Sequence, residues 1–141
     1  MSPVFIDTAH HIAVFNVDDP LHRTAITLAN EMSANRSITF VTTHLVFAEF
    51  LASTSRAGHL RVAAAAYVSA LMAERRVAVV DLTPPLFERS LSLYRSRPDK
   101  RHSLTDCFSM VVCEDLGITD VLTSDHDFEQ EGFNIMLRPT K

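Results

Sequence analysis

The chain has 141 residues, of which 47% are hydrophobic and 21% charged, so it can bury an ordinary core and is not expected to be disordered. We expect a single domain over residues 1–141. The net charge of −4 gives no overall attraction for nucleic acid, although carboxylates that bind a metal ion would reverse the local field.

The sequence shows no pattern that would direct it to a membrane or to an oxidising compartment. It has no signal-peptide pattern and no apolar run of the roughly 18 residues needed to span a bilayer. Cys107 and Cys113 lie in one apolar stretch and match neither a zinc-ligand spacing nor a disulfide framework. We therefore expect a protein of the reducing cytoplasm that has no membrane partner.

Apolar, β-branched runs alternate with helical segments along the chain. In chain order we predict a strand over residues 4–6, helices over 9–15 and 21–34, a strand over 37–42, helices over 44–55 and 59–73, a strand over 76–80, helices over 84–95 and 104–116, a strand over 120–123, a polar loop over 124–127 and a short edge strand over 134–137. Thr43 can cap the helix that follows it, and Gly117 is expected to end its helix in the left-handed conformation.

This alternation predicts an α/β fold with a mostly parallel sheet of four to five strands, covered by helices on both faces. In such sheets ligands bind beyond the carboxyl ends of the strands. Asp7, Asp81 and Asp125 each follow a predicted strand, so we expect all three at that edge.

Two acidic residues in the first half of the chain are candidates for a site at this edge. Asp7 could point its carboxylate into a crevice, although a cap for the following helix is an equally good interpretation. Glu49 is the only charged residue within residues 45–52, in a helix that we expect to be largely buried. A buried carboxylate is costly unless it is paired, neutralised or bound to a metal, so the alternatives are an arginine partner or a narrow solvent-facing stripe.

Two further acids come from the second half. Asp106 lies in the first turn of an apolar helix, where the helix dipole favours an anion. Ser103 and Asp106 also approximate a capping box, so Asp106 alone is better explained as a cap. Asp125 follows a predicted strand and alone would be a solvated loop acid. As a set, the four carboxylates suit Mg²⁺ or Mn²⁺, which prefer oxygen ligands and promote phosphodiester hydrolysis.

Four segments, taken in order, resemble those that carry the acids of PIN domains, in particular the short VapC-type toxins of bacterial toxin–antitoxin pairs. Residues 4–8 resemble the opening strand and first acid of that family, and residues 41–49 resemble its second acid, within a helix. Residues 97–107 resemble the segment of the third acid, and residues 117–128 that of the fourth. The resemblance spans almost the whole chain.

The resemblance implies a three-layer, Rossmann-like PIN fold and a metal-dependent endoribonuclease that hydrolyses RNA with a metal-activated water. The implied ligands of Mg²⁺ or Mn²⁺ are Asp7, Glu49, Asp106 and Asp125, and the implied polar residues beside the third acid are Ser103 and Thr105. The implied partners are single-stranded or structured RNA, such as tRNA, a cognate antitoxin protein and a second copy in a homodimer. Before Asp106, a basic run of Arg95, Arg97, Lys100 and Arg101 would suit phosphate positioning, and a solvated turn explains it equally well.

Two other functions stay open. A Mg²⁺-dependent phosphatase on a similar sheet is suggested by residues 125–127, but it lacks a matching acid pair after the first strand. A PIN-like protein that binds RNA or a partner without cutting is disfavoured by the four intact acids. No histidine pair has zinc-motif spacing, so we expect His10 and His11 to be surface or supporting residues. Asp81, Glu114 and Asp127 stay outside the predicted core set.

Overall fold

The computed structural model describes residues 2–139 and contains a five-stranded sheet. The strands are β1 (Ser2–Ile6), β2 (Ile38–Thr43), β3 (Val77–Val80), β4 (Asp120–Leu122) and β5 (Asn134–Ile135). Their order in the sheet is β3-β2-β1-β4-β5, and every neighbouring pair is parallel. The predicted α/β class and the mostly parallel sheet of four to five strands are therefore confirmed.

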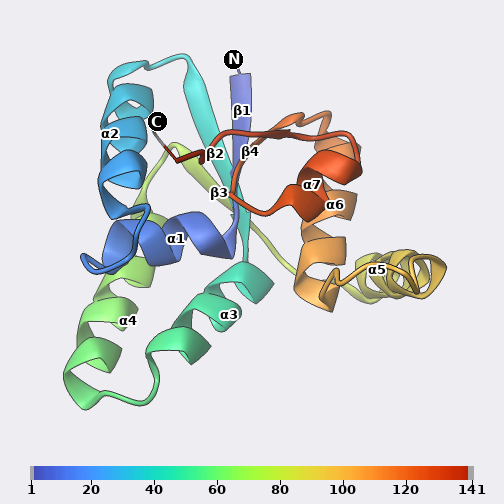
Figure 1. Cartoon of the computed structure of the whole chain (residues 1–141), viewed down its shortest axis with the longest axis horizontal. Coiled ribbons are helices and arrows are strands. Elements are labelled where there is room, and N and C mark those ends of the chain that lie inside the picture. The colour runs from blue at the N-terminus through green and yellow to red at the C-terminus, as the bar shows by residue number, and fades with distance from the viewer. Residues whose placement is uncertain (1, 140–141) are drawn as a thin grey trace.

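Helices cover both faces of this sheet (Figure 1). They are α1 (Thr8–Phe15), α2 (His22–Ala34), α3 (His44–Thr54), α4 (Gly58–Ala73), α5 (Pro84–Ser96), α6 (Leu104–Leu116) and α7 (His126–Gln130). The helices α1, α2 and α4 lie on one side, and α5, α6 and α7 lie on the other, with α3 extending beyond the carboxyl end of β2 (Figure 1). None of the helices within residues 2–139 is long and apolar enough to cross a membrane.

The two faces of β1 are buried in different cores, which explains its uninterrupted apolar sequence. Val4 and Ile6 pack with Met32 of α2 on one face. Phe5 points to the other face and packs with Phe108 of α6. Strands that are buried on both faces read as continuous apolar runs rather than as alternating ones, as the sequence of β1 does.

The predicted helix ends are confirmed at two positions. The hydroxyl of Thr43 accepts a hydrogen bond of 3.0 Å from the backbone N–H of Val46 and so caps α3. Gly117 ends α6 with φ 66°, in the left-handed region that glycine adopts without strain. The prediction of a loop over residues 124–127 was wrong, because α7 begins within it at His126. This helix has only five residues, too few to show helical periodicity in the sequence.

Candidate active site

The strand order places the carboxyl ends of β1 and β4 side by side. Within the sheet, β2 is the neighbour of β1 on one side and β4 is its neighbour on the other. Such a reversal is the point at which open α/β sheets bind ligands. Asp7 follows β1 there, and its backbone N–H donates a 3.2 Å hydrogen bond to the carbonyl of Leu122 at the end of β4.

Asp7 is buried at this point and only half of its carboxylate has a partner. The residue stands at the N-cap position of α1, yet its side chain makes no capping hydrogen bond, so the interpretation of Asp7 as a helix cap is wrong. Its Oδ2 accepts a 2.8 Å hydrogen bond from the hydroxyl of Thr123. Its Oδ1 is buried without any hydrogen-bond partner among the described residues. A buried oxygen without a partner is costly, and it is a position that a cation would satisfy.

The protonation of Asp7 reflects both this burial and its acidic neighbours. Burial raises the pKa of Asp7 from 3.8 to about 7, and the negative charges of Asp106 and Glu49 add to the increase. The Thr123 hydroxyl and the Thr8 backbone N–H act in the opposite direction. At neutral pH, Asp7 therefore exists in both its protonated and its charged form.

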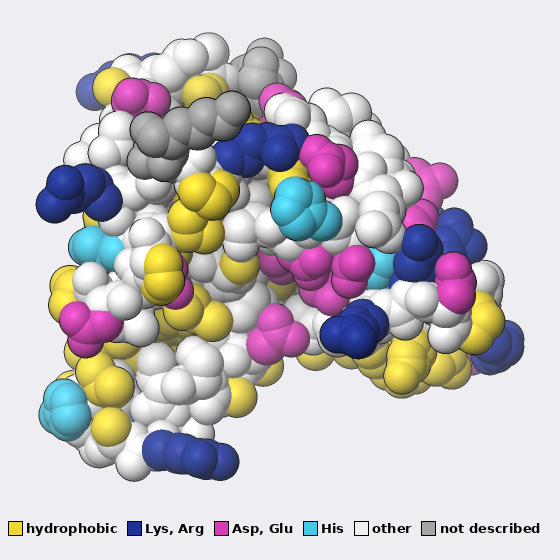
Figure 2. Space-filling view, in the orientation of Figure 1, with side chains coloured by type: hydrophobic (Ala, Val, Ile, Leu, Met, Phe, Trp, Pro, Cys, Tyr) yellow, Lys and Arg dark blue, Asp and Glu magenta, His cyan; other side chains and the backbone are white. Residues whose placement is uncertain are grey.

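The four predicted acids come from distant parts of the sequence but act on one another. Burial raises the pKa of Asp106, and the charges of Asp125 and Glu49 add to this effect. Asp106 and Glu49 in turn raise the pKa of Asp7. Figure 2 shows acidic side chains gathered near the middle of one face, with Lys and Arg side chains to one side. The structure thus brings all four carboxylates to the same region.

Glu49 differs from its prediction in one respect, since it is exposed rather than buried. Helix α3 buries Val46, Phe47 and Phe50 and turns Ala48 and Glu49 to solvent. The argument from a costly buried carboxylate was therefore wrong for this residue, and the alternative of a solvent-facing stripe is confirmed. Because the helix starts directly after β2, this stripe faces the region of the other acids.

Asp106 is a helix cap as well as a member of the acid group. Its backbone N–H donates a 3.0 Å hydrogen bond to the hydroxyl of Ser103, and its Oδ2 accepts one of 3.1 Å from the Ser103 backbone N–H. This reciprocal pair is a capping box, as the sequence predicted. Only Oδ2 is engaged in this way among the described residues. Thr105 is half-buried one position before it, and its carbonyl accepts a 2.9 Å hydrogen bond from Ser109.

Thr123 links the first and last acids, and the sequence analysis did not identify it. Besides donating to Asp7, its hydroxyl oxygen accepts a 3.1 Å hydrogen bond from the backbone N–H of Asp125. Asp125 caps α7, because its Oδ1 accepts a 2.9 Å hydrogen bond from the backbone N–H of Asp127. A polar residue placed directly after an apolar strand and two residues before an acid was the available signal.

The side chains present suit a hard cation, although they do not form a closed ligand set as they stand. Within residues 2–139, no group of three or more His, Cys, Asp or Glu side chains is placed to hold a metal ion. The donor chemistry nevertheless fits Mg²⁺ or Mn²⁺, because the group offers carboxylate oxygens only. The buried Oδ1 of Asp7, which has no partner among the described residues, is an oxygen that such a cation could bind.

His10 and His11 are both buried, so of the two expectations for them, surface residues or supporting residues, the first was wrong. His11 is hydrogen-bonded to the Tyr67 hydroxyl at 2.9 Å and to the Thr42 hydroxyl at 3.3 Å. Burial lowers the pKa of His10 to about 4 and that of His11 to about 3, so both rings are neutral at physiological pH. Their role is to support the structure around α1.

The remaining acids considered from the sequence have other contacts or lie elsewhere. Asp81 contacts the ring of His44 at 2.6 Å, and Asp127 lies 3.4 Å from the ring of His102. Glu114 is exposed in the last turn of α6, whereas Asp106 lies in the first turn of that helix.

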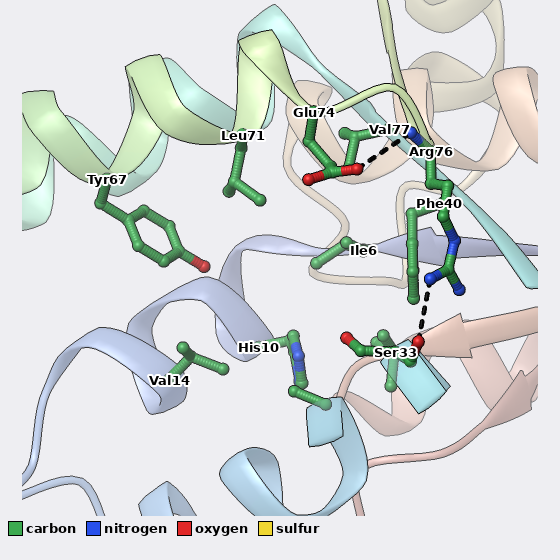
Figure 3. A pocket seen from close by; sticks show the side chains of 12 residues that line it. Ile6, His10, Val14, Ser33, Phe40, Tyr67, Leu71, Glu74, Arg76 and Val77 are labelled. Atoms are coloured by element: carbon green, nitrogen blue, oxygen red, sulfur yellow. Dashed lines mark hydrogen bonds between the residues drawn. The ribbon is translucent and has the colours of Figure 1, made fainter. Parts of the chain in front are cut away.

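A separate hollow of about 340 Å³ lies on the opposite face of the sheet, between α1, α2 and α4. Figure 3 shows His10 and Tyr67 pointing into it, with Arg76 holding the end of α2 through a 2.9 Å hydrogen bond to the Ser33 carbonyl. None of the four acids lines this hollow.

The sequence matches the family model of the PIN domain over residues 4–134, so the chain belongs to the PIN domain family. Its structure is similar to that of VapC20 from Mycobacterium tuberculosis, a sarcin–ricin loop cleaving toxin, with a TM-score of 0.80. The two sequences are 27% identical, and the match covers 94% of this chain and 98% of that chain. A structure of VapBC2 from Rickettsia felis, bound to a DNA fragment from their promoter, has the same fold, with 11% identity, 95% and 97% coverage and a TM-score of 0.69. No curated protein sequence matches. The resemblance to PIN domains and VapC-type toxins is confirmed.

Proposed function

We propose that this chain is a metal-dependent endoribonuclease and the toxin of a type II toxin–antitoxin pair. The observation that carries the proposal is Asp7, a buried carboxylate with a partnerless oxygen at the switch point of the sheet, whose pKa is raised by burial and by the nearby acids Asp106 and Glu49. Membership of the PIN family and the similarity to VapC20 support it.

In this proposal Asp7, Glu49, Asp106 and Asp125 hold Mg²⁺ or Mn²⁺. When bound, such an ion supplies a Lewis acid for the phosphate and makes water a stronger nucleophile. Thr123 holds Oδ2 of Asp7, and the unpartnered Oδ1 would be available to bind the ion.

Two polar residues beside the third acid complete the proposed site. Ser103 fixes Oδ2 of Asp106 through its backbone N–H, and Thr105 lies next to it in the first turn of α6. Because Asp7 is partly protonated without metal, cation binding at neutral pH should release a proton from its carboxyl group.

The proposal is tested by incubating purified protein with total cellular RNA in Mg²⁺ or Mn²⁺, beside a chelator and the variants Asp7→Asn and Asp18→Asn. Asp18 is an exposed aspartate before α2, so its variant controls for the substitution itself. We expect discrete products that require both the metal and Asp7. The similarity to VapC20, a sarcin–ricin loop cleaving toxin, favours RNA that contains this loop as the first substrate to map, with tRNA second. Products that persist in Asp7→Asn would contradict the proposal.

The same experiment separates the two other functions. A phosphatase would release phosphate from a small ester such as p-nitrophenyl phosphate and leave RNA intact. A non-catalytic PIN-like protein would bind RNA without forming products.

We also propose that the protein acts in the cytoplasm as a homodimer and is inhibited by a protein antitoxin. Membership of the PIN family and the similarity to the VapBC2 structure support an antitoxin partner. Light scattering after size exclusion would give the oligomeric state. Stoichiometric loss of RNA cleavage on adding a candidate antitoxin would identify the partner.

A further inference from the structure

A second hollow, of about 540 Å³, lies where the end of α5 meets the start of α6. A volume of this size is typical of sites that bind small ligands or parts of larger ones. It is lined by Leu91, Tyr94, Arg95, Arg97, Pro98, Lys100, Arg101, His102 and Ser103. Four of these residues are cationic and none is acidic, although the whole chain has a net charge of −4. The hollow is therefore a local positive site on an acidic protein.

Two of the cations fix the loop that forms the hollow. Arg97 donates a 2.8 Å hydrogen bond from Nε to Glu131, and Lys100 donates one of 2.9 Å from Nζ to Gln130. The ring of His102 also contacts Glu131, at 3.2 Å. These contacts tie the loop between α5 and α6 to the end of α7, so the walls of the hollow are in place before any ligand binds.

The two remaining cations are free to bind a ligand. Among residues 2–139, neither Arg95 nor Arg101 forms an ion pair with a carboxylate, and both are exposed. The sequence had suggested a single basic run, either for phosphates or as a solvated turn. The structure divides that run, with Arg97 and Lys100 in structural contacts and Arg95 and Arg101 available for phosphates.

An exposed aromatic ring lies beside these free cations. Tyr94 is 49% exposed on α5, and no hydrogen bond to its hydroxyl is formed within the described residues. Exposed aromatic rings next to positive charge are the usual platform on which unpaired bases stack.

The hollow adjoins the proposed active site through one residue. Ser103 lines the hollow and is also the capping-box partner of Asp106. A nucleotide that occupies the hollow would therefore lie next to the first turn of α6 and its acid. Figure 2 shows Lys and Arg side chains immediately beside the group of acidic side chains.

We propose that this hollow binds one unpaired RNA nucleotide, with the base stacked on Tyr94 and the flanking phosphates held by Arg95 and Arg101. The site would position an unpaired segment of the substrate so that the neighbouring phosphodiester reaches the acids. This inference rests on the proposed ribonuclease function and adds to it that unpaired RNA is recognised at a defined position.

The test measures RNA binding in chelator, where metal-dependent cleavage is absent. A fluorescein-labelled single-stranded RNA of mixed sequence is titrated with the full chain and followed by anisotropy, beside the same strand annealed to its complement. Tyr94→Ala should weaken binding of the single strand by roughly ten-fold, whereas Tyr94→Phe, which keeps the ring, should bind as the wild type does. Arg95→Gln and Arg101→Gln should each reduce the slope of log affinity against log salt by about 0.7. Arg23→Gln, an exposed arginine on α2, is the matched control and should leave the slope of binding unchanged.

A second measurement reports on the ring itself. The chain has two tyrosines and no tryptophan, so 3-fluorotyrosine labelling gives one fluorine NMR signal for Tyr94 and one for the mostly buried Tyr67. The single-stranded RNA should move only the Tyr94 signal, which Tyr94→Phe assigns by its disappearance.

Several outcomes would overturn the inference. The inference fails if Tyr94→Ala binds the single strand as tightly as the wild type does. It also fails if Tyr94→Ala weakens binding of the duplex as much as binding of the single strand. A Tyr94 signal that responds to protein concentration instead of RNA would assign the surface to a second copy of the chain. Metal-dependent cleavage by wild type and by Tyr94→Ala at equal KM would refute this site while leaving the proposed ribonuclease function intact.

Discussion

Replacing Asp7 by Asn should stabilise the metal-free protein, and the effect should depend on pH. The pKa of Asp7 is raised from 3.8 to about 7, chiefly by burial, so the folded state binds this proton more tightly than the unfolded state does. The contribution of Asp7 to stability is fully present below pH 3.8, falls as the pH rises towards 7, and is level above that. In this window the free energy of unfolding falls by about 1.4 kcal/mol for each pH unit, so ionisation of Asp7 lowers it by roughly 2 to 3 kcal/mol between pH 5 and pH 8.

The measurement compares variants rather than pH values, because other groups titrate in the same range. His10 and His11 have folded-state pKa values of about 4 and 3, so they are destabilising as the pH falls below 6.5 and oppose Asp7. Both histidines are present in the wild type and in Asp7→Asn, so their effects cancel in the difference between the free energies of unfolding of these two proteins. Urea unfolding in chelator at pH 5 and pH 8 should show that Asp7→Asn gains roughly 2 to 3 kcal/mol more at pH 8, while Asp18→Asn gains nothing.

Adding Mg²⁺ gives the second half of this test. A saturating cation should raise the stability of the wild type by about 2.7 kcal/mol at a hundred times its dissociation constant, and should raise that of Asp7→Asn much less. If the free energies of unfolding of the wild type and Asp7→Asn differ by the same amount at pH 5 and at pH 8, Asp7 does not titrate in this window. The reasoning from its burial and acidic neighbours would then be refuted.

Four other substitutions test individual contacts. Asp106→Asn should weaken Mg²⁺ binding in calorimetry by roughly ten-fold or more, and unchanged affinity would remove Asp106 from the ligand set. Glu49→Gln should abolish cleavage and change the free energy of unfolding by less than about 0.5 kcal/mol, because the side chain is exposed; a collapsed variant would indicate a structural ion pair. Thr123→Val removes a hydrogen bond that lowers the pKa of Asp7, so it should raise that pKa further and weaken Mg²⁺ binding at pH 7; equal binding would deny Thr123 a positioning role. Gly117→Ala should cost roughly 1 kcal/mol in thermal unfolding with unchanged cleavage, since its φ is 66° and a Cβ there meets no atom within 4 Å; an unchanged melting temperature would contradict the left-handed conformation.

Most of the fold could be predicted from the sequence because its elements have strong local signals. The apolar run of β1 is buried on both faces, and the caps at Thr43 and Gly117 mark helix ends that the structure confirms. Helix α7 was missed because five residues are too few for periodicity, and its start depends on the capping bond from Asp127 to Asp125.

The candidate site was only partly predictable. Sequence patterns indicated the four acids, but each position alone had an ordinary structural explanation. Asp106 is indeed a cap, and Glu49 is not buried, so neither local argument was sufficient. Thr123 and the partnerless oxygen of Asp7 appear only when the ends of β1 and β4 are placed side by side.

The alternation of strands and helices, and with it the parallel sheet and the edge at which polar groups collect, follows from local sequence signals, because hydrophobic periodicity and capping are properties of neighbouring residues. Which charges share an environment depends instead on how distant segments pack. Burial and Coulomb interactions depend on distance in space, so the pKa of Asp7 is raised chiefly by burial and further by Asp106 and Glu49, residues far away along the chain. The same holds for the basic run before α6, where contacts with α7 separate the structural cations, Arg97 and Lys100, from those left free to meet a ligand.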